Sequence, residues 1–98
     1  MGRREETSRP EVRRYAVNLS AKAFDWLQEC RDAKLKGRVS EVIEALAVEP
    51  RPAGSKKLKG EDRAWRVRVG DFRVLYEVHD EQLVVLVIRI AKREDAYR

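Results

Sequence analysis

Apolar and polar residues alternate on both sides of the dipeptide Gly70-Asp71. In residues 65–69 the apolar positions alternate with arginines, and beyond the dipeptide every second residue from Phe72 to Val78 is apolar. A period of two is typical of β-strands, and a two-residue Gly-Asp connection suits a primed turn. The pattern therefore predicts a tight β-hairpin.

Three arginines of this hairpin, Arg66, Arg68 and Arg73, are predicted to share one face of the sheet. If Gly70 and Asp71 form the turn, Arg68 lies opposite Arg73, and Arg66 follows two residues along on the same side. Like charges in this position destabilise an antiparallel pair by a few tenths to about 1 kcal/mol. A polyanion would remove this repulsion, which makes the arginine face a candidate phosphate-binding site.

The first half of the chain begins with a period of two and then changes to the helical period. Alternation at Tyr15, Val17 and Leu19 indicates a short strand, and Ser20 follows it as a candidate helix cap. Gly37 is expected to separate a first helix from a second. The apolar positions of the first helix are Phe24, Leu27 and Cys30, and those of the second are Val39, Val42, Ile43, Leu46 and Ala47.

Two prolines, Pro50 and Pro52, end the second helix, and residues 53–57 are expected to form a flexible basic connection. Residues 83–90 form an almost continuous Val/Leu/Ile run, interrupted only by Arg89, which favours a strand covered on both faces. The expected order is β-α-α-β-β-β. This order predicts an α+β fold in which two N-terminal helices pack on a curved, mostly antiparallel four-stranded sheet.

Composition adds a basic surface to this small fold. The chain has 98 residues, a formal charge of +5 and a pI of about 9.7, so it should attract phosphate. Residues 1–14 lack apolar periodicity and are expected to form a disordered extension, which leaves residues 15–98 as a single domain. No apolar run reaches the length of a membrane span, so a soluble, cytoplasmic protein is expected. Cys30, the single cysteine, is expected to pack within a helix.

Three motifs follow one another in the second half of the chain. They are Lys57-Leu-Lys-Gly60, then Arg66-Val-Arg-Val-Gly-Asp-Phe-Arg-Val-Leu-Tyr76, and finally Lys92-Arg93-Glu-Asp-Ala-Tyr97. This series resembles the RelE/ParE superfamily of toxins from bacterial toxin–antitoxin pairs, and the likeness extends from about Tyr15 to Arg98. The resemblance implies the β-α-α-β-β-β fold, which the hydrophobic pattern also predicts.

Within that superfamily, the RelE branch consists of messenger-RNA endonucleases that cut in the ribosomal A site, whereas the ParE branch acts on DNA gyrase. The ending with Arg93 and Tyr97 resembles the RelE branch, in which an arginine and a tyrosine contribute to the active site. The positions of Arg66 and Arg68 are often lysine in that branch, and Ala91 stands where glycine is more usual. The catalytic residues that the resemblance implies are Arg66, Arg68, Arg73, Arg93 and Tyr97.

RNA can be cut without a metal ion when its own 2′-hydroxyl attacks the adjacent phosphorus. The enzyme must then orient the RNA, stabilise charge and move protons. Arginines suit the second task, because a planar guanidinium donates paired hydrogen bonds to phosphate and stays charged, but they are poor bases for the same reason. No metal or other cofactor is therefore predicted.

The residues that would move protons are less well defined by the sequence. Tyr97 would serve as a base or an orienting group if neighbouring arginines lowered its pKa from about 10, and its alternative role is aromatic packing on the sheet. Arg93 would place positive charge near the leaving oxygen or would form a surface salt bridge. His79, the only histidine, is expected in a turn with Asp80 and Glu81, away from the arginines, so no histidine–carboxylate pair of the kind usual in ribonucleases is evident.

Other basic and aromatic residues have weaker assignments. Lys56, Lys57 and Lys59 border the hairpin and are expected to bind RNA phosphates without sequence specificity. Trp65 and Phe72 alternate with the arginines and are therefore expected on the core side of the hairpin. For Trp26, on the first helix, the sequence leaves core, partner contact and surface open.

Three functions are compatible with these patterns. The first is a ribosome-dependent endoribonuclease toxin, held silent by a co-encoded acidic antitoxin, whose further partners are mRNA in the ribosomal A site and ribosomal RNA. The second is a gyrase inhibitor that acts by protein binding. The third is a catalytically inactive relative that still binds RNA or antitoxin. The arginine-rich hairpin together with the near-terminal tyrosine favours the first.

Overall fold

The computed structural model of the protein describes residues 14–92, in which two helices pack on a five-stranded, mostly antiparallel sheet. The elements, in chain order, are β1 (Ala16–Leu19), α1 (Ala21–Glu29), α2 (Ala33–Ala45), β2 (Lys56–Lys57), β3 (Ala64–Val69), β4 (Phe72–His79), the 3₁₀ turn η2 (Asp80–Gln82) and β5 (Val84–Lys92). The predicted α+β class is confirmed. The strand count was wrong by one, because part of the supposedly flexible basic connection pairs with β3 as β2.

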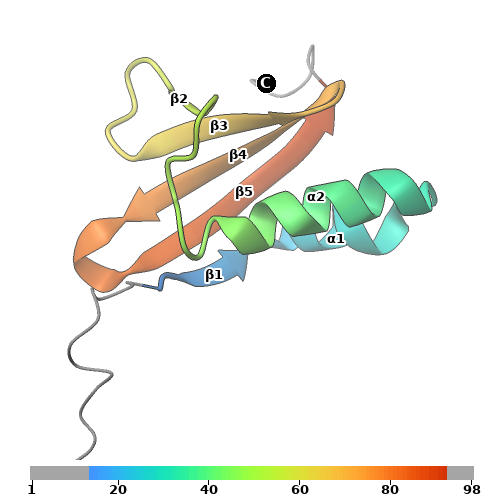
Figure 1. The fold of residues 1–98 in the computed structure, drawn as a ribbon, viewed down its shortest axis with the longest axis horizontal. Coiled ribbons are helices and arrows are strands. Elements are labelled where there is room, and N and C mark those ends of the chain that lie inside the picture. Colours follow the sequence, from blue (N-terminus) through green and yellow to red (C-terminus); the bar gives the residue numbers. More distant parts are fainter. Residues whose placement is uncertain (1–13, 93–98) are drawn as a thin grey trace, which may run out of the picture.

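The strands lie in the order β1-β5-β4-β3-β2, with β3, β4 and β5 as the long members (Figure 1). Only β1 and β5 are parallel; the other neighbouring pairs are antiparallel. The apolar run forms β5, which is an inner strand of the sheet, as its composition predicts. It is not fully covered on both faces. Val85 and Val87 are buried, whereas Leu86 and Ile88 on the other side are half-buried.

Both helices begin at side-chain caps that the sequence contains. The Ser20 hydroxyl accepts a hydrogen bond from the Ala23 amide at 3.1 Å, as predicted for α1. Asp32 does the same for α2, accepting from the Leu35 amide at 3.1 Å. The break between the helices therefore lies at residues 30–32, and Gly37 lies inside α2, so the expectation that Gly37 separates them was wrong. Cys30 ends α1 and is half-buried.

The core lies between the helices and one face of the sheet. The second helical stripe is confirmed, with Val39, Ile43 and Leu46 buried among strand residues such as Val74. The stripe of α1 is shifted by one position: Ala23 is buried, while Phe24 is 51% exposed. Because residues three and four apart share a helix face, Ala23, Trp26 and Leu27 face the core, and Phe24 lies beside that stripe. Trp26, whose role the sequence left open, is half-buried and packs against the core.

The two faces of the sheet differ in what they present. Successive residues of a strand point to opposite sides, so Trp65, Val67 and Val69 face the helices, and Arg66 and Arg68 point to the opposite side. We call this opposite side the open face. Within residues 14–92, no helix is long and apolar enough to cross a membrane.

Candidate functional site

The β3–β4 hairpin has the predicted register. Arg68 pairs with Arg73, Val69 pairs with Phe72, and Gly70 takes a positive φ of 61° at the turn. An added Cβ at Gly70 would lie 2.7 Å from Nη2 of Arg38, which shows that this α2 side chain reaches the turn. The three arginines of the hairpin therefore share the open face, as expected.

Arg66 differs from the other two hairpin arginines in its burial. It is only 7% exposed, and it is the single buried charged residue among residues 14–92. Within that described part of the chain, its guanidinium makes no hydrogen bond or ion pair. A buried charge without a partner lowers the stability of the fold, and a bound anion would compensate this cost.

A cleft of about 810 Å³ opens on this face of the sheet, next to Arg66. Six cationic and two acidic side chains contribute to its lining, and leucine, isoleucine and alanine residues supply apolar surface. The cationic residues are Lys22, Lys56, Lys57, Lys59, Arg66 and Arg89, and the acidic ones are Glu61 and Glu77. We call this hollow the Arg66 cleft. Its excess of positive charge and its apolar surface suit a ligand with phosphate groups and flat bases.

The fold brings together only some of the predicted site residues. Arg66 and all three predicted lysines line the Arg66 cleft. Arg68 lines an adjoining hollow of about 330 Å³, to which Arg66 and Lys56 also contribute. Arg73 is half-buried opposite Arg68 and lines neither of these hollows. Arg93 and Tyr97 lie outside the described residues, so their predicted roles stay predictions.

Arg89 joins the cleft because β5 is irregular. Opposite Leu75 lies Arg89, but opposite Tyr76 lies Val87, so Ile88 is an extra residue in β5. Regular alternation would have placed Arg89 on the core side together with Val87. The bulge instead turns both Ile88 and Arg89 towards the cleft. The charge that interrupts the apolar run was visible in the sequence, but the bulge that gives it this position was not.

A histidine–carboxylate pair borders the cleft, because His79 does not lie in the turn where the sequence placed it. His79 is the last residue of β4 and lies on the same side of that strand as Glu77. Nε2 of His79 lies 2.8 Å from Oε1 of Glu77, and Glu77 lines the Arg66 cleft. The prediction that His79 lies in the turn was wrong, because β4 continues to that residue.

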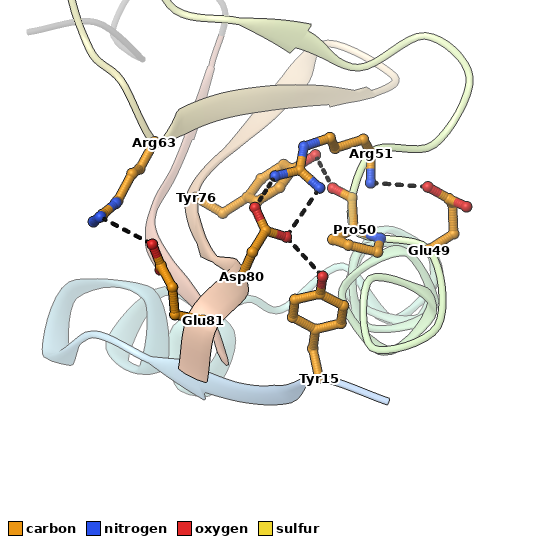
Figure 2. A network of polar contacts seen from close by, with 8 residues as sticks. All are labelled: Tyr15, Glu49, Pro50, Arg51, Arg63, Tyr76, Asp80 and Glu81. Atoms are coloured by element: carbon orange, nitrogen blue, oxygen red, sulfur yellow. Dashed lines mark hydrogen bonds and ion pairs between the residues drawn. The ribbon is translucent and has the colours of Figure 1, made fainter. Parts of the chain in front are cut away.

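Arg51, which lies outside the Arg66 cleft, forms a polar network with Asp80, the residue that follows the end of β4 (Figure 2). Its guanidinium donates to Asp80 through Nη2 at 2.6 Å and Nη1 at 3.3 Å, and it lies 5.4 Å from the centre of the Trp65 ring. Tyr15 donates its hydroxyl to Asp80 at 2.7 Å. The hydrogen bond to Asp80 raises the pKa of Tyr15 and of Arg51. We call these three residues, Tyr15, Arg51 and Asp80, the Arg51 network.

Two further contacts hold the segment that leads to β2. The Tyr76 hydroxyl, which is buried, donates to the Pro50 carbonyl at 2.8 Å (Figure 2), and burial raises the pKa of this phenol. The Arg51 amide donates to a carboxylate oxygen of Glu49 at 3.2 Å. The chain between α2 and β2 is thereby fixed just before the lysines that enter the Arg66 cleft.

The aromatic side chains of the hairpin lie on the core side, as predicted. Trp65 and Phe72 are partly buried against the core, and Phe72 makes an edge contact with Trp26 at 5.4 Å between ring centres. These three rings therefore stabilise the sheet and the first helix. In residues 14–92, no three histidine, cysteine or acidic side chains lie close enough together to hold a metal ion.

The family model for the ParE toxin of the type II toxin–antitoxin system parDE matches residues 11–97. The chain belongs to the RelE/ParE superfamily of toxins. A candidate toxin of Methanocaldococcus jannaschii, named RelE1, is 33% identical to it over 88 residues, which cover 87% of this chain and 97% of the relative.

Solved structures of the superfamily have the same fold as this toxin. The RelBE2 toxin–antitoxin complex of Mycobacterium tuberculosis contains a chain that matches with a TM-score of 0.71 and 26% identity, covering 89% of this chain and 100% of that one. The archaeal RelE–RelB complex of Pyrococcus horikoshii matches with a TM-score of 0.71 and 29% identity, covering 84% and 98%. Both matched proteins were solved together with an antitoxin.

Proposed function

We propose that this toxin is an endoribonuclease that cuts messenger RNA on the ribosome and binds RNA phosphate in the Arg66 cleft. The observation that carries the proposal is the burial of Arg66 without a partner in residues 14–92. A phosphate placed there would receive paired charge-assisted hydrogen bonds and would compensate the buried charge. The relatives named RelE support the same class of activity.

The reaction would use the RNA's own nucleophile. The 2′-oxygen forms a bond to the adjacent phosphorus as its proton passes to a base, and the bond from phosphorus to the 5′-oxygen breaks as that oxygen takes up a proton. Arg66, Arg68 and Arg73 would stabilise the charge of the pentacoordinate phosphate. Arg93 and Tyr97 would contribute to the leaving group and to proton transfer.

The lysines of the cleft would hold the RNA on either side of the reacting phosphate. Lys56 pairs with Arg66 across β2 and β3, so the two side chains are neighbours on the sheet, and Lys57 and Lys59 continue the same basic wall. Such contacts strengthen binding through counterion release and carry no sequence information. Choice of the cleavage position would therefore come from the ribosome or from bases in the cleft.

A co-encoded antitoxin would silence this toxin, as in the related complexes with RelB. We expect an acidic antitoxin that covers the open face, including Arg73, or displaces the C-terminal residues around Arg93 and Tyr97. Such a partner would neutralise the basic cleft and prevent RNA from entering it. A complex with these arginines left accessible would contradict this mechanism of inhibition.

Inhibition of DNA gyrase is the second candidate, because the matching family model is named for ParE. The two functions can be separated in growing cells by inducing the toxin without antitoxin and measuring incorporation of labelled amino acid and thymidine. We expect protein synthesis to stop first. An early loss of DNA synthesis while translation continues would support the gyrase function and contradict the proposed one.

The chemistry can be tested with purified toxin and programmed ribosomes. We expect a 5′-hydroxyl on one fragment and a 2′,3′-cyclic phosphate or 3′-phosphate on the other. Cleavage should also persist with a chelator once the magnesium requirement of the ribosome is met separately. A 5′-phosphate on the product would exclude attack by the 2′-hydroxyl.

A further inference from the structure

Arg66 and Glu77 have opposite charges and line the same cleft, yet they do not form an ion pair. Arg66 lies opposite Leu75, so Glu77, two residues further along β4, is its diagonal neighbour on the same face. Diagonal neighbours in a sheet lie about 7–8 Å apart at their Cα atoms, within reach of two long side chains. The absence of this ion pair requires an explanation, because Arg66 has no other partner in residues 14–92.

The partner that Glu77 does have is His79. Nε2 of the ring lies 2.8 Å from Oε1 of the carboxylate, and the two side chains are 24% and 36% exposed. Residues two apart in a strand point to the same side, so His79 contacts Glu77 from the end of β4 that lies away from Arg66. The ring can donate from Nε2 both when that nitrogen alone carries a proton and when the ring is charged.

We propose that His79 is a positioning residue that holds the Glu77 carboxylate away from Arg66 and so keeps the guanidinium available for a phosphodiester. A carboxylate bound to Arg66 would occupy the donors that a phosphate needs, and its negative charge would repel the phosphate. The inference deepens the proposed function, on which it rests for the identity of the anion as RNA phosphate.

The nearest neighbours of Glu77 across the sheet offer it no alternative side-chain partner. Leu75 separates Arg66 from Arg89 across the sheet, and Ala64 lies directly opposite Glu77. Neither residue offers a hydrogen bond from its side chain to Glu77. Among the side chains of residues 14–92, His79 is therefore the only observed hydrogen-bond partner of this carboxylate.

The test compares anion binding by the full-length parental toxin with four variants. The probes are a fluorescent RNA oligonucleotide with 2′-deoxyribose at every position that could be cut, and inorganic tripolyphosphate. His79→Ala should weaken binding of both probes about tenfold, because the released Glu77 carboxylate would take the place of one charge-assisted contact between Arg66 and the probe. The double variant His79→Ala/Glu77→Gln should restore parental affinity, because the neutral amide no longer competes as a carboxylate.

Two matched variants distinguish positioning from a general loss of structure. His79→Gln keeps a donor and should bind both probes as the parent does. His79→Ala/Glu61→Gln removes a different carboxylate of the cleft and should stay as weak as His79→Ala. Thermal melts of each protein confirm that only folded chains are compared.

Each outcome decides one of the two claims. Unchanged affinity of His79→Ala, or a double variant that stays weak when Glu77 is neutralised, would overturn the positioning role. If tripolyphosphate binding follows the expected pattern but the parent neither binds RNA nor cuts it on ribosomes, the positioning role stands and the proposed function fails. If the parent cuts RNA and no variant changes affinity, the proposed function stands and the positioning role is wrong.

Discussion

Two arginines on opposite faces of β3 show opposite relations between burial and pairing. Arg51 packs over Trp65 on the helix side, keeps 37% of its side chain exposed and donates twice to Asp80. Arg66, the next residue after Trp65, is 7% exposed and has no partner within residues 14–92. The more buried cation is thus the one without a counter-charge.

This difference separates a structural role from a functional one. An exposed, fully bonded pair such as Arg51–Asp80 connects two segments at little desolvation cost. A buried guanidinium without a partner lowers stability, and a protein retains such a group where a ligand supplies the missing charge. Changes at the Arg51 network should therefore affect stability, and changes on the open face should affect RNA cleavage.

The largest expected effect is on cleavage and concerns Arg73, opposite Arg68 on the open face. Arg73→Ala should lower the single-turnover rate on programmed ribosomes by about 10²–10³, because it removes a preorganised donor to the phosphate. Its free energy of unfolding should change by less than about 1 kcal/mol, since the repulsion between Arg73 and Arg68 is also lost. Cleavage at the parental rate would place Arg73 outside the active site.

The next largest effect is on stability and concerns Tyr76, whose side chain lies on the face of the sheet that packs against the helices. Tyr76→Phe removes the hydrogen bond to the Pro50 carbonyl and leaves a buried acceptor without its donor. The free energy of unfolding should fall by about 1–2 kcal/mol in denaturant titrations. No change would mean that this hydroxyl does not fix the segment before β2.

A smaller loss is expected for the exposed pair. Asp80→Ala should destabilise the protein by about 1 kcal/mol, and by less at high salt, because both partners are partly exposed and their attraction is screened. In a double-mutant cycle, Arg51→Ala should cost less in the Asp80→Ala background than in the parent. Strictly additive effects would show that the pair contributes nothing to stability.

The smallest expected effect is a dependence of stability on alkaline pH. The hydrogen bond to Asp80 raises the pKa of Tyr15 above its ordinary value of 10.0. A raised phenol pKa contributes stability that is complete below the ordinary value and is lost as the pH rises through the folded-state value. Unfolding free energies of the parent should therefore fall more steeply above pH 10 than those of Tyr15→Phe, and parallel curves would contradict the assigned cause.

The hairpin was predictable because its turn and its alternation agree. A two-residue connection fixes the register, so Arg68 opposite Arg73 follows from local sequence alone. The apolar stripe of α2 was predictable because its apolar residues recur at the helical spacing of three and four positions. The break between the helices was misplaced because Gly37 is tolerated inside α2 at a cost of about 1 kcal/mol, whereas Asp32 provides the cap.

The candidate site needed information that local patterns do not contain. One inserted residue, Ile88, reverses the alternation of β5 and brings Arg89 to the cleft. Arg66 pairs with Lys56 of β2, a strand of only two residues that composition suggested was a loop. The Arg51 network joins residues far apart in the chain, such as Tyr15 and Asp80, 65 positions apart. These features follow from tertiary packing.

The most direct test of the central claim compares Arg66→Gln with Arg51→Gln in two measurements, single-turnover cleavage on programmed ribosomes and unfolding by denaturant. We predict that Arg66→Gln lowers the cleavage rate by about 10²–10³ while its free energy of unfolding stays the same or rises. Arg51→Gln should lose stability yet cut RNA at close to the parental rate at temperatures where it is folded. If Arg66→Gln cuts at the parental rate, or loses activity only because it unfolds, the buried arginine is not the phosphate site.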